Sequence, residues 1–141
     1  MGKINSYKHI FFDLDHTLWD YEKNSNEALN ELFLKYKLNS LGINNCEQFT
    51  LCFEEVNRSL WDDYNKNKIS RDGIREQRFL RILSQFEINN LELSEKLSTE
   101  YLMLCPTKPH LIPYTFEVLD YLKVNYQLHI LTNGFNDVQK L

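Results

Sequence analysis

The sequence contains few residues that break helices or cross-link a chain. Its 141 residues include 4 glycines, 3 prolines and 3 cysteines. Glycine and proline together fall well below their average share of about 12%, so we expect long helices, short connections and no flexible linker. The three cysteines, Cys46, Cys52 and Cys105, lack the spacing of a metal site. They predict buried thiols in a reducing compartment.

Long apolar runs and clusters of basic residues are also missing. No apolar run approaches the ~18 residues of a membrane span, and no signal-peptide pattern opens the sequence. The 16 basic and 20 acidic residues give a net charge of −4, and the basic ones are scattered. This pattern argues against a nucleic-acid surface or an anionic-membrane surface. We therefore expect a cytoplasmic protein that binds neither nucleic acid nor membrane.

Two short apolar runs, residues 7–12 and 127–131, predict buried parallel strands, because each is β-rich and ends at small or acidic residues. Nearly everything between them carries apolar residues at i, i+3 and i+4, which is typical of helices with one buried face. The expected helices cover residues 22–38, 47–65, 70–86, 93–104 and 113–125.

The order of these elements predicts an α/β fold in two parts. A simple crossover between parallel strands needs about a dozen residues, yet residues 13–126 separate the two strands. We assign residues 19–105 to an inserted helical cap, and residues 1–18 and 106–141 to a partial Rossmann-like core. Two strands and one helix cannot complete such a sheet, so the sequence is expected to be the N-terminal part of a larger protein.

Two carboxylates directly follow the first predicted strand. Asp13 and Asp15 stand two residues apart, at the edge where open α/β sheets bind ligands. Neighbouring anions repel, so such a pair is commonly held by a hard cation with oxygen ligands, of which Mg²⁺ is the usual one. The alternative for an isolated pair is a solvated acidic turn.

The second predicted strand ends in Thr132-Asn133-Gly134. A hydroxyl group, a side-chain amide and a glycine N–H are donors suited to phosphoryl oxygens. Alone, this tripeptide is a common turn. Combined with the two aspartates on the neighbouring strand, it predicts a phosphate-binding site.

These two segments resemble the first and second motifs of the haloacid dehalogenase (HAD) superfamily. The matching residues are Phe-Phe-Asp-Leu-Asp-His-Thr-Leu at 11–18 and Ile-Leu-Thr-Asn-Gly at 130–134. The resemblance implies a Rossmann-like core with a C1-type helical cap. An acid at position 15 implies phosphoryl transfer rather than dehalogenation. His16, where glycine is common, and residues 60–79 are similar to the YjjG-like branch, which implies a pyrimidine 5′-monophosphate substrate.

The resemblance also implies a role for each motif residue. Asp13 would be the nucleophile that forms an aspartyl-phosphate, and Asp15 the general acid and base. Asp13 and Asp15 would hold Mg²⁺, while Leu14, Thr132 and Asn133 would bind the phosphoryl oxygens. The third-motif Lys or Arg and the fourth-motif acidic residues are expected beyond residue 141, because Lys140 lies too close to the second motif.

Four further residues are candidates for substrate contacts. Trp61 and Tyr64 could stack on a base, Arg78 could reach a sugar or phosphate, and Trp19 could flank the substrate entrance. The alternatives are that Trp61 and Tyr64 pack between helices, that Arg78 is solvated, and that Trp19 packs at a hinge. For the whole chain, a non-catalytic binding module, a sugar-phosphate phosphatase and a phosphomutase remain open, and no oligomeric state is favoured.

Overall fold

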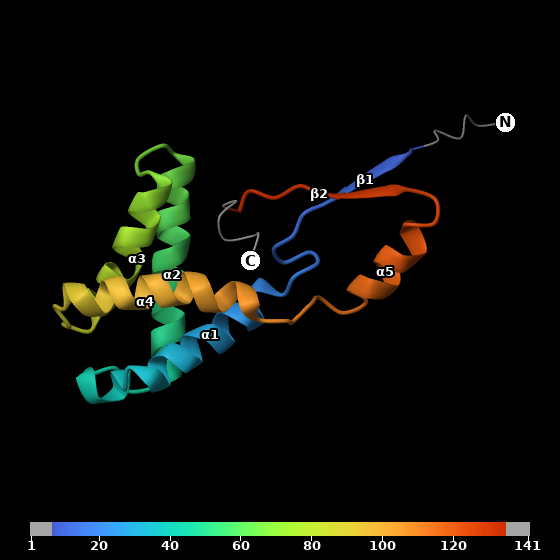
Figure 1. The fold of residues 1–141 in the computed structure, drawn as a ribbon. Helices are drawn as coiled ribbons and strands as arrows, with labels where there is room; N and C mark the ends of the chain where they lie inside the picture. The colour runs from blue at the N-terminus through green and yellow to red at the C-terminus, as the bar shows by residue number, and fades with distance from the viewer. Residues whose placement is uncertain (1–6, 135–141) are drawn as a thin grey trace. The chain divides into compact units, whose positions relative to one another are not determined.

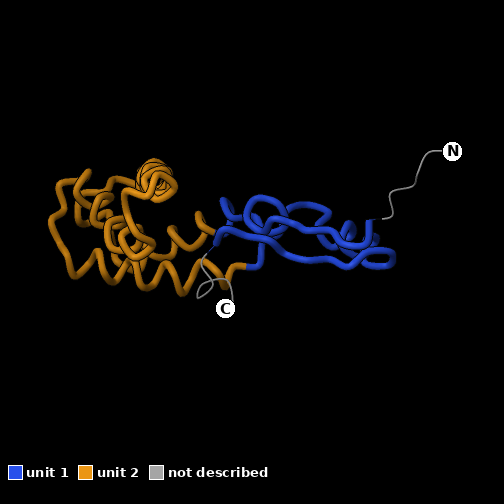
Figure 2. Tube along the Cα trace, turned by 90° about the horizontal axis from the view of Figure 1, so that it is seen from above, with its two compact units in different colours: residues 1–24, 109–141 blue, residues 25–108 orange. Residues whose placement is uncertain are grey.

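The computed structural model describes residues 7–134, which form two compact units (Figure 2). Of the described residues, 7–24 and 109–134 form the strand unit, and 25–108 form the helical unit. Within the described residues, no helix is long and apolar enough to cross a membrane. The assignment of these units as a catalytic core and a cap stays a prediction.

Between the two strands of the described residues lie five helices (Figure 1), of which the first four follow one another before the chain returns to the strand unit, and α1 begins in the strand unit. These four are joined by short connections, as the scarcity of glycine and proline predicts. They are α1 (Tyr21–Lys35), α2 (Cys46–Asn65), α3 (Arg71–Gln85) and α4 (Leu91–Leu104), and short 3₁₀ turns cover Leu38–Leu41 and Cys105–Thr107.

Side-chain caps explain where all four of these helices begin. The side chains of Asp20, Asn45, Ser70 and Asn90 accept hydrogen bonds from the backbone N–H three residues later, at 3.0, 2.9, 3.0 and 2.9 Å. Each bond satisfies one of the N–H groups that a helix leaves unpaired in its first turn. Helix starts were therefore predictable within about two residues.

The core of the helical unit consists of the apolar stripes that the sequence predicts. At its centre the Phe53 ring lies 5.8 Å from Phe79 and 4.9 Å from Tyr101, measured between ring centroids. Side chains from all four helices are fully or almost fully buried: Ala28, Leu29, Leu32, Phe49, Phe53, Leu60, Ile74, Phe79, Ile82, Leu83 and Leu97.

Several helix boundaries differ from the prediction by one to three residues, and left-handed residues account for two of these differences. Lys37 has φ 49°, so α1 ends at Lys35, three residues before its expected end, and a 3₁₀ turn begins at Leu38. Tyr114 has φ 68°, so α5 (Thr115–Leu122) begins two residues after the expected Pro113. Neither conformation is signalled by residue type, since glycine or asparagine is usual there.

The two predicted strands pair in parallel, β1 (His9–Phe12) with β2 (Gln127–Ile130), and Phe12 lies opposite Ile130 (Figure 1). The expectation that they are buried is wrong for several side chains, since Phe11 is 62% and Ile130 59% exposed. Within residues 7–134 the sheet has two strands only, which leaves these faces uncovered. The fold is therefore α/β, with an incomplete Rossmann-like parallel sheet.

Candidate active site

The two predicted catalytic carboxylates follow β1 at the carboxyl edge of the sheet. Asp13 is exposed and Asp15 is half-buried. The strand pairing extends one step past β2, because the Leu131 N–H donates to the Phe12 carbonyl oxygen at 2.8 Å. The structure thus puts the ends of both motifs on neighbouring strands at one sheet edge.

A tight turn redirects the chain immediately after Asp13. The Leu14 carbonyl oxygen accepts hydrogen bonds from the N–H groups of Leu18 and Trp19, at 2.9 and 3.0 Å. His16 sits inside this turn with φ 61° and donates its N–H to the Trp19 carbonyl oxygen at 2.9 Å. The turn takes Asp15 off the straight path of the strand, so the two carboxylates occupy different surroundings.

The electrostatic environment of Asp15 favours its protonated form. Burial raises the pKa of Asp15 above its ordinary value of 3.8, and the negative charge of Asp13 raises it further, while His16 opposes the shift. Asp15 therefore keeps its proton to higher pH than a solvated carboxyl group. A proton donor in a hydrolytic site needs this property.

The Thr132-Asn133-Gly134 segment forms a small side-chain turn after β2. The Gly134 N–H donates to Thr132 Oγ at 3.1 Å, which fixes the orientation of the Thr132 side chain. Thr132 is half-buried and Asn133 is exposed. A hydroxyl and backbone N–H groups at this edge are donors of the kind that phosphate oxygens accept.

The donor atoms at this edge fit a hard cation. The Asp13 carboxylate and the Asp15 backbone carbonyl are oxygen ligands, the type that Mg²⁺ prefers. In the part of the chain from Tyr7 to Gly134, no group of three or more His, Cys, Asp or Glu side chains is arranged to hold a metal. These residues can therefore contribute only part of an octahedral ligand shell.

Arg78 lies inside the helical unit. It is 6% exposed, and its guanidinium carbon is 5.5 Å from the centre of the Phe53 ring and 5.6 Å from that of Tyr101. The alternative of a solvated Arg78 is wrong, because the flat guanidinium packs against aromatic faces. Its role as a substrate ligand stays a prediction.

The other substrate candidates lie in both units. Trp61 and Tyr64 form an edge-to-face pair on α2, with ring centroids 5.6 Å apart, and both are half-buried. Trp19 is half-buried in the strand unit, and its ring lies 6.1 Å from that of Tyr21. The pairing of Trp61 with Tyr64 leaves part of each ring accessible, so both remain candidates for stacking.

Sequence reasoning missed Asn24, which is fully buried. Its side chain donates to the His110 carbonyl oxygen at 2.8 Å and accepts from the His110 N–H at 3.0 Å. These two hydrogen bonds, which we call the Asn24 clamp, link the segments where the chain leaves and re-enters the strand unit. The available signal was a polar residue in the apolar stripe of α1, four positions before Ala28.

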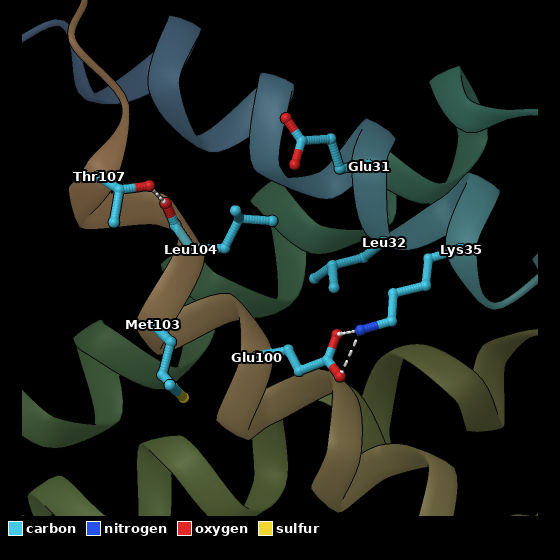
Figure 3. Close-up of a pocket in the computed structure, with 7 residues that line it drawn as sticks. All are labelled: Glu31, Leu32, Lys35, Glu100, Met103, Leu104 and Thr107. Carbon is cyan, nitrogen blue, oxygen red and sulfur yellow. Dashed lines mark hydrogen bonds and ion pairs between the residues drawn. The ribbon is translucent and has the colours of Figure 1, made fainter.

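The helical unit also contains a cleft of about 460 Å³ between α1 and α4 (Figure 3). Lys35 crosses it to pair with Glu100, with both Nζ–O distances at 2.8 Å. None of the predicted site residues lines it. The lining residues are Glu31, Leu32, Lys35, Glu100, Met103, Leu104 and Thr107.

Known proteins similar to this chain are hydrolases. The pyrimidine 5′-nucleotidase PynA of Streptococcus pneumoniae is 28% identical over 94% of this chain, and YjjG, the pyrimidine 5′-nucleotidase of Escherichia coli, is 26% identical over 94%. Each match covers 54% of the relative, so the chain spans about half the length of the curated relatives it matches. No protein-family model matches the sequence.

Solved structures share the fold. The magnesium-bound crystal structure of the HAD-hydrolase YfnB of Bacillus subtilis has a TM-score of 0.82 at 24% identity, over 95% of this chain and 56% of that one. A 2-haloacid dehalogenase from Pseudomonas syringae has a TM-score of 0.52 over 96% and 59%. The predicted resemblance to the HAD superfamily, and within it to YjjG-like pyrimidine 5′-nucleotidases, is therefore confirmed over nearly the whole chain.

Proposed function

We propose that this chain carries the nucleophile of a Mg²⁺-dependent phosphomonoester hydrolase whose substrate is a pyrimidine nucleoside 5′-monophosphate. The main support is that Asp13 and Asp15 follow β1 and Thr132 follows the paired strand β2, at the same edge of the sheet. The pyrimidine 5′-nucleotidases among its relatives support the substrate class.

The first chemical step belongs to the two aspartates. A carboxylate oxygen of Asp13 attacks the phosphorus, the bond from phosphorus to the nucleoside oxygen breaks, and Asp15 gives its proton to that leaving oxygen. Asp15, now a carboxylate, then takes a proton from a water molecule that attacks the aspartyl-phosphate. This second step releases inorganic phosphate and restores Asp13. The raised pKa of Asp15 supports its role as the initial proton donor.

The remaining groups stabilise charge on the transferring phosphoryl group. The Thr132 hydroxyl and the N–H groups of Leu14 and Asn133 donate to its oxygens as negative charge accumulates there. Asp13 and the backbone carbonyl of Asp15 would hold Mg²⁺. When bound, this ion supplies positive charge that offsets the repulsion between the Asp13 carboxylate and the phosphate.

Base recognition is assigned to the exposed parts of the aromatic side chains. Trp61 and Tyr64 offer ring surface on α2, and Trp19 offers ring surface close to the catalytic turn. Aromatic stacking of this kind is worth about 1–3 kcal/mol per base. Arg78 is buried against Phe53 and Tyr101, which favours a packing role over direct contact with the substrate.

The second candidate function is a non-catalytic interaction module. The exposed apolar side chains of the strand unit, such as Phe11 and Ile130, favour it, because such surfaces are usually covered by a partner. Phosphomutases and sugar-phosphate phosphatases would use the same aspartates, so only a comparison of substrates separates them from a nucleotidase.

The test is phosphate release by the purified protein with UMP, dTMP and a panel of sugar phosphates, with and without Mg²⁺. Asp13→Asn is expected to lower kcat at least about a thousandfold, because the nucleophile is lost. Asp120→Asn is the matched control, since this exposed aspartate on α5 pairs only locally with Lys123. Activity retained in Asp13→Asn would overturn the mechanism, and a preference for sugar phosphates would overturn the substrate class. No activity in the wild type would favour the interaction module.

A further inference from the structure

Two histidines meet on one face of the sheet. His9 and Phe11 on β1 share that face with Gln127 and His129 on β2, because paired residues of parallel strands point to the same side. The His9 Nδ1 and His129 Nε2 atoms lie 2.9 Å apart, within hydrogen-bond distance. Within the described residues, His9 is exposed and His129 is half-buried.

The rings are also held in place. Phe11 stacks on His129, with ring centroids 4.7 Å apart and an interplanar angle of 20°. The two imidazoles lie 5.2 Å apart and are tilted by 33°. The strand pairing fixes their backbones, since Phe11 lies opposite His129 and His9 opposite Gln127. Both nitrogen atoms are therefore positioned before any ligand arrives.

The spacing of the two nitrogens matches that of two ligands on one metal ion. Zinc–nitrogen bonds of about 2.0–2.1 Å place two imidazole nitrogens about 2.9 Å apart at a 90° angle and about 3.3 Å apart at the tetrahedral angle. The observed 2.9 Å falls within this range, so the two nitrogen atoms have the separation that two ligands of one ion require, and each ring has to turn its lone pair away from the N–N line to bind it. Neutral imidazoles suit Zn²⁺, Cu²⁺ and Ni²⁺ and not Mg²⁺.

We propose that His9 and His129 form a binding site for one divalent transition metal ion such as Zn²⁺, separate from the oxygen ligands at Asp13. The ion takes the place of the hydrogen bond between the two rings. The proton of the donating imidazole moves through solvent to the other nitrogen of the same ring, so both rings stay neutral and no net proton is released. Water completes the shell, and Gln127 places a side-chain amide on the same face.

Such a site would cross-link the two strands that carry the predicted phosphate-binding motifs. His9 precedes Asp13 by four residues on one strand, and His129 precedes Thr132 by three on the other. A bound ion would therefore stabilise β1 against β2 without touching the catalytic carboxylates. The proposal does not depend on the phosphatase function, because it rests on the histidine geometry alone.

The test is calorimetric titration of the purified protein with ZnCl₂ in Mg²⁺-free and chelator-free buffer. His9→Gln and His129→Gln are each expected to weaken zinc binding by at least about tenfold, because loss of a ligand costs no less than loss of its supporting partner. His110→Gln, elsewhere in the strand unit, is the matched control and should bind like the wild type. Asp13→Asn should also keep the affinity, since its carboxylate is not a ligand of this site.

A second measurement does not depend on variants. The EPR spectrum of Cu²⁺ bound to the wild type should show coupling to two imidazole nitrogens, and excess Mg²⁺ should not displace the ion. The proposal is overturned if the wild type binds no zinc up to about 1 mM, a free energy of only about −4 kcal/mol. It is equally overturned if both glutamine variants bind zinc like the wild type, or if Asp13→Asn abolishes binding.

Discussion

The helical unit and the strand unit bury their apolar side chains to very different extents. In the helical unit Phe49, Phe79 and Leu83 are completely buried. In the strand unit Phe11 is 62%, Ile130 59% and Tyr121 76% exposed. The helical unit closes a core of its own, whereas the strand unit presents apolar surface that needs a covering layer.

The difference follows from the geometry of helices and sheets. Each helix buries one stripe, and four helices packed together can shield all of those stripes. A parallel sheet has two faces and two edges, and such sheets are stable when helices cover both faces. In the described part of the strand unit, hydrogen bonds of buried side chains link distant segments of the chain. Asn24 bonds to His110, and Thr115 Oγ donates to the Leu18 carbonyl oxygen.

The largest expected effect is the difference in unfolding free energy between two alanine variants, one in each unit. Phe79→Ala should lower the free energy of unfolding of the helical unit by about 3–5 kcal/mol, because it opens a cavity beside Phe53. Phe11→Ala should cost less than about 1 kcal/mol, since the ring is mostly exposed. The protein has one tryptophan in each unit, Trp19 and Trp61, so urea unfolding of single-tryptophan variants reports each unit separately.

Equal losses of unfolding free energy in Phe79→Ala and Phe11→Ala would contradict the difference in burial between the two units. A large loss for Phe11→Ala would mean that the Phe11 face is covered in solution, by a second copy of the chain or by another surface. Repeating the measurement at several protein concentrations separates these two cases, because only self-association makes the midpoint depend on concentration.

The sequence was sufficient to predict the features that depend on local pattern. Apolar residues at helical spacing identified the five helices of residues 7–134, and side-chain caps mark where α1, α2, α3 and α4 begin. The parallel pairing of β1 with β2 also followed, because both runs are short, apolar and closed by polar motifs. The Asp-x-Asp pair and Thr132 were thereby placed at one edge of the sheet.

Features that depend on contacts between residues distant in the sequence could not be predicted from the sequence alone. The ring contacts of Arg78 come from α2 and α4, so its burial cannot be inferred from its neighbours in sequence. The Asn24–His110 hydrogen bonds have the same origin, because the two residues are 86 positions apart in the sequence. The left-handed conformation of Tyr114 has no signal in its residue type. The exposure of Phe11 was missed because an apolar strand alone does not indicate whether a layer covers it.

Removing the Asn24 clamp is expected to have an intermediate effect, confined to the strand unit. Asn24→Ala leaves the part-buried His110 N–H without its side-chain partner, at a cost of about 1–3 kcal/mol, while the His110 carbonyl keeps the Asp20 N–H as a donor. Unfolding followed through Trp19 in a Trp61→Phe background measures it. Asn30→Ala is the matched control, because Asn30 is exposed on the same helix and alanine favours helices. Similar losses in both variants would mean that the clamp contributes nothing.

The smallest expected effect concerns how the stability of each unit depends on pH. One carboxyl group in each unit contributes to this dependence, and the two contributions have opposite signs. Lys35 and Tyr36 hydrogen-bond Glu100 and lower its pKa below the ordinary 4.5, so Glu100 stabilises the helical unit above that pH and the stabilisation is lost on acidification. Burial and the Asp13 charge raise the pKa of Asp15 above 3.8, so stability of the strand unit falls as pH rises and Asp15 ionises.

Glu100→Gln should therefore make the helical unit less stable at pH 7 and leave it nearly unchanged at low pH. Asp15→Asn should make the strand unit more stable at pH 7 in metal-free buffer, measured through Trp19. A loss of stability at pH 7 in Asp15→Asn would show that the site does not penalise the Asp15 charge, and it would count against Asp15 as a proton donor. A gain of stability in Glu100→Gln would contradict the stabilising role of the Glu100 charge.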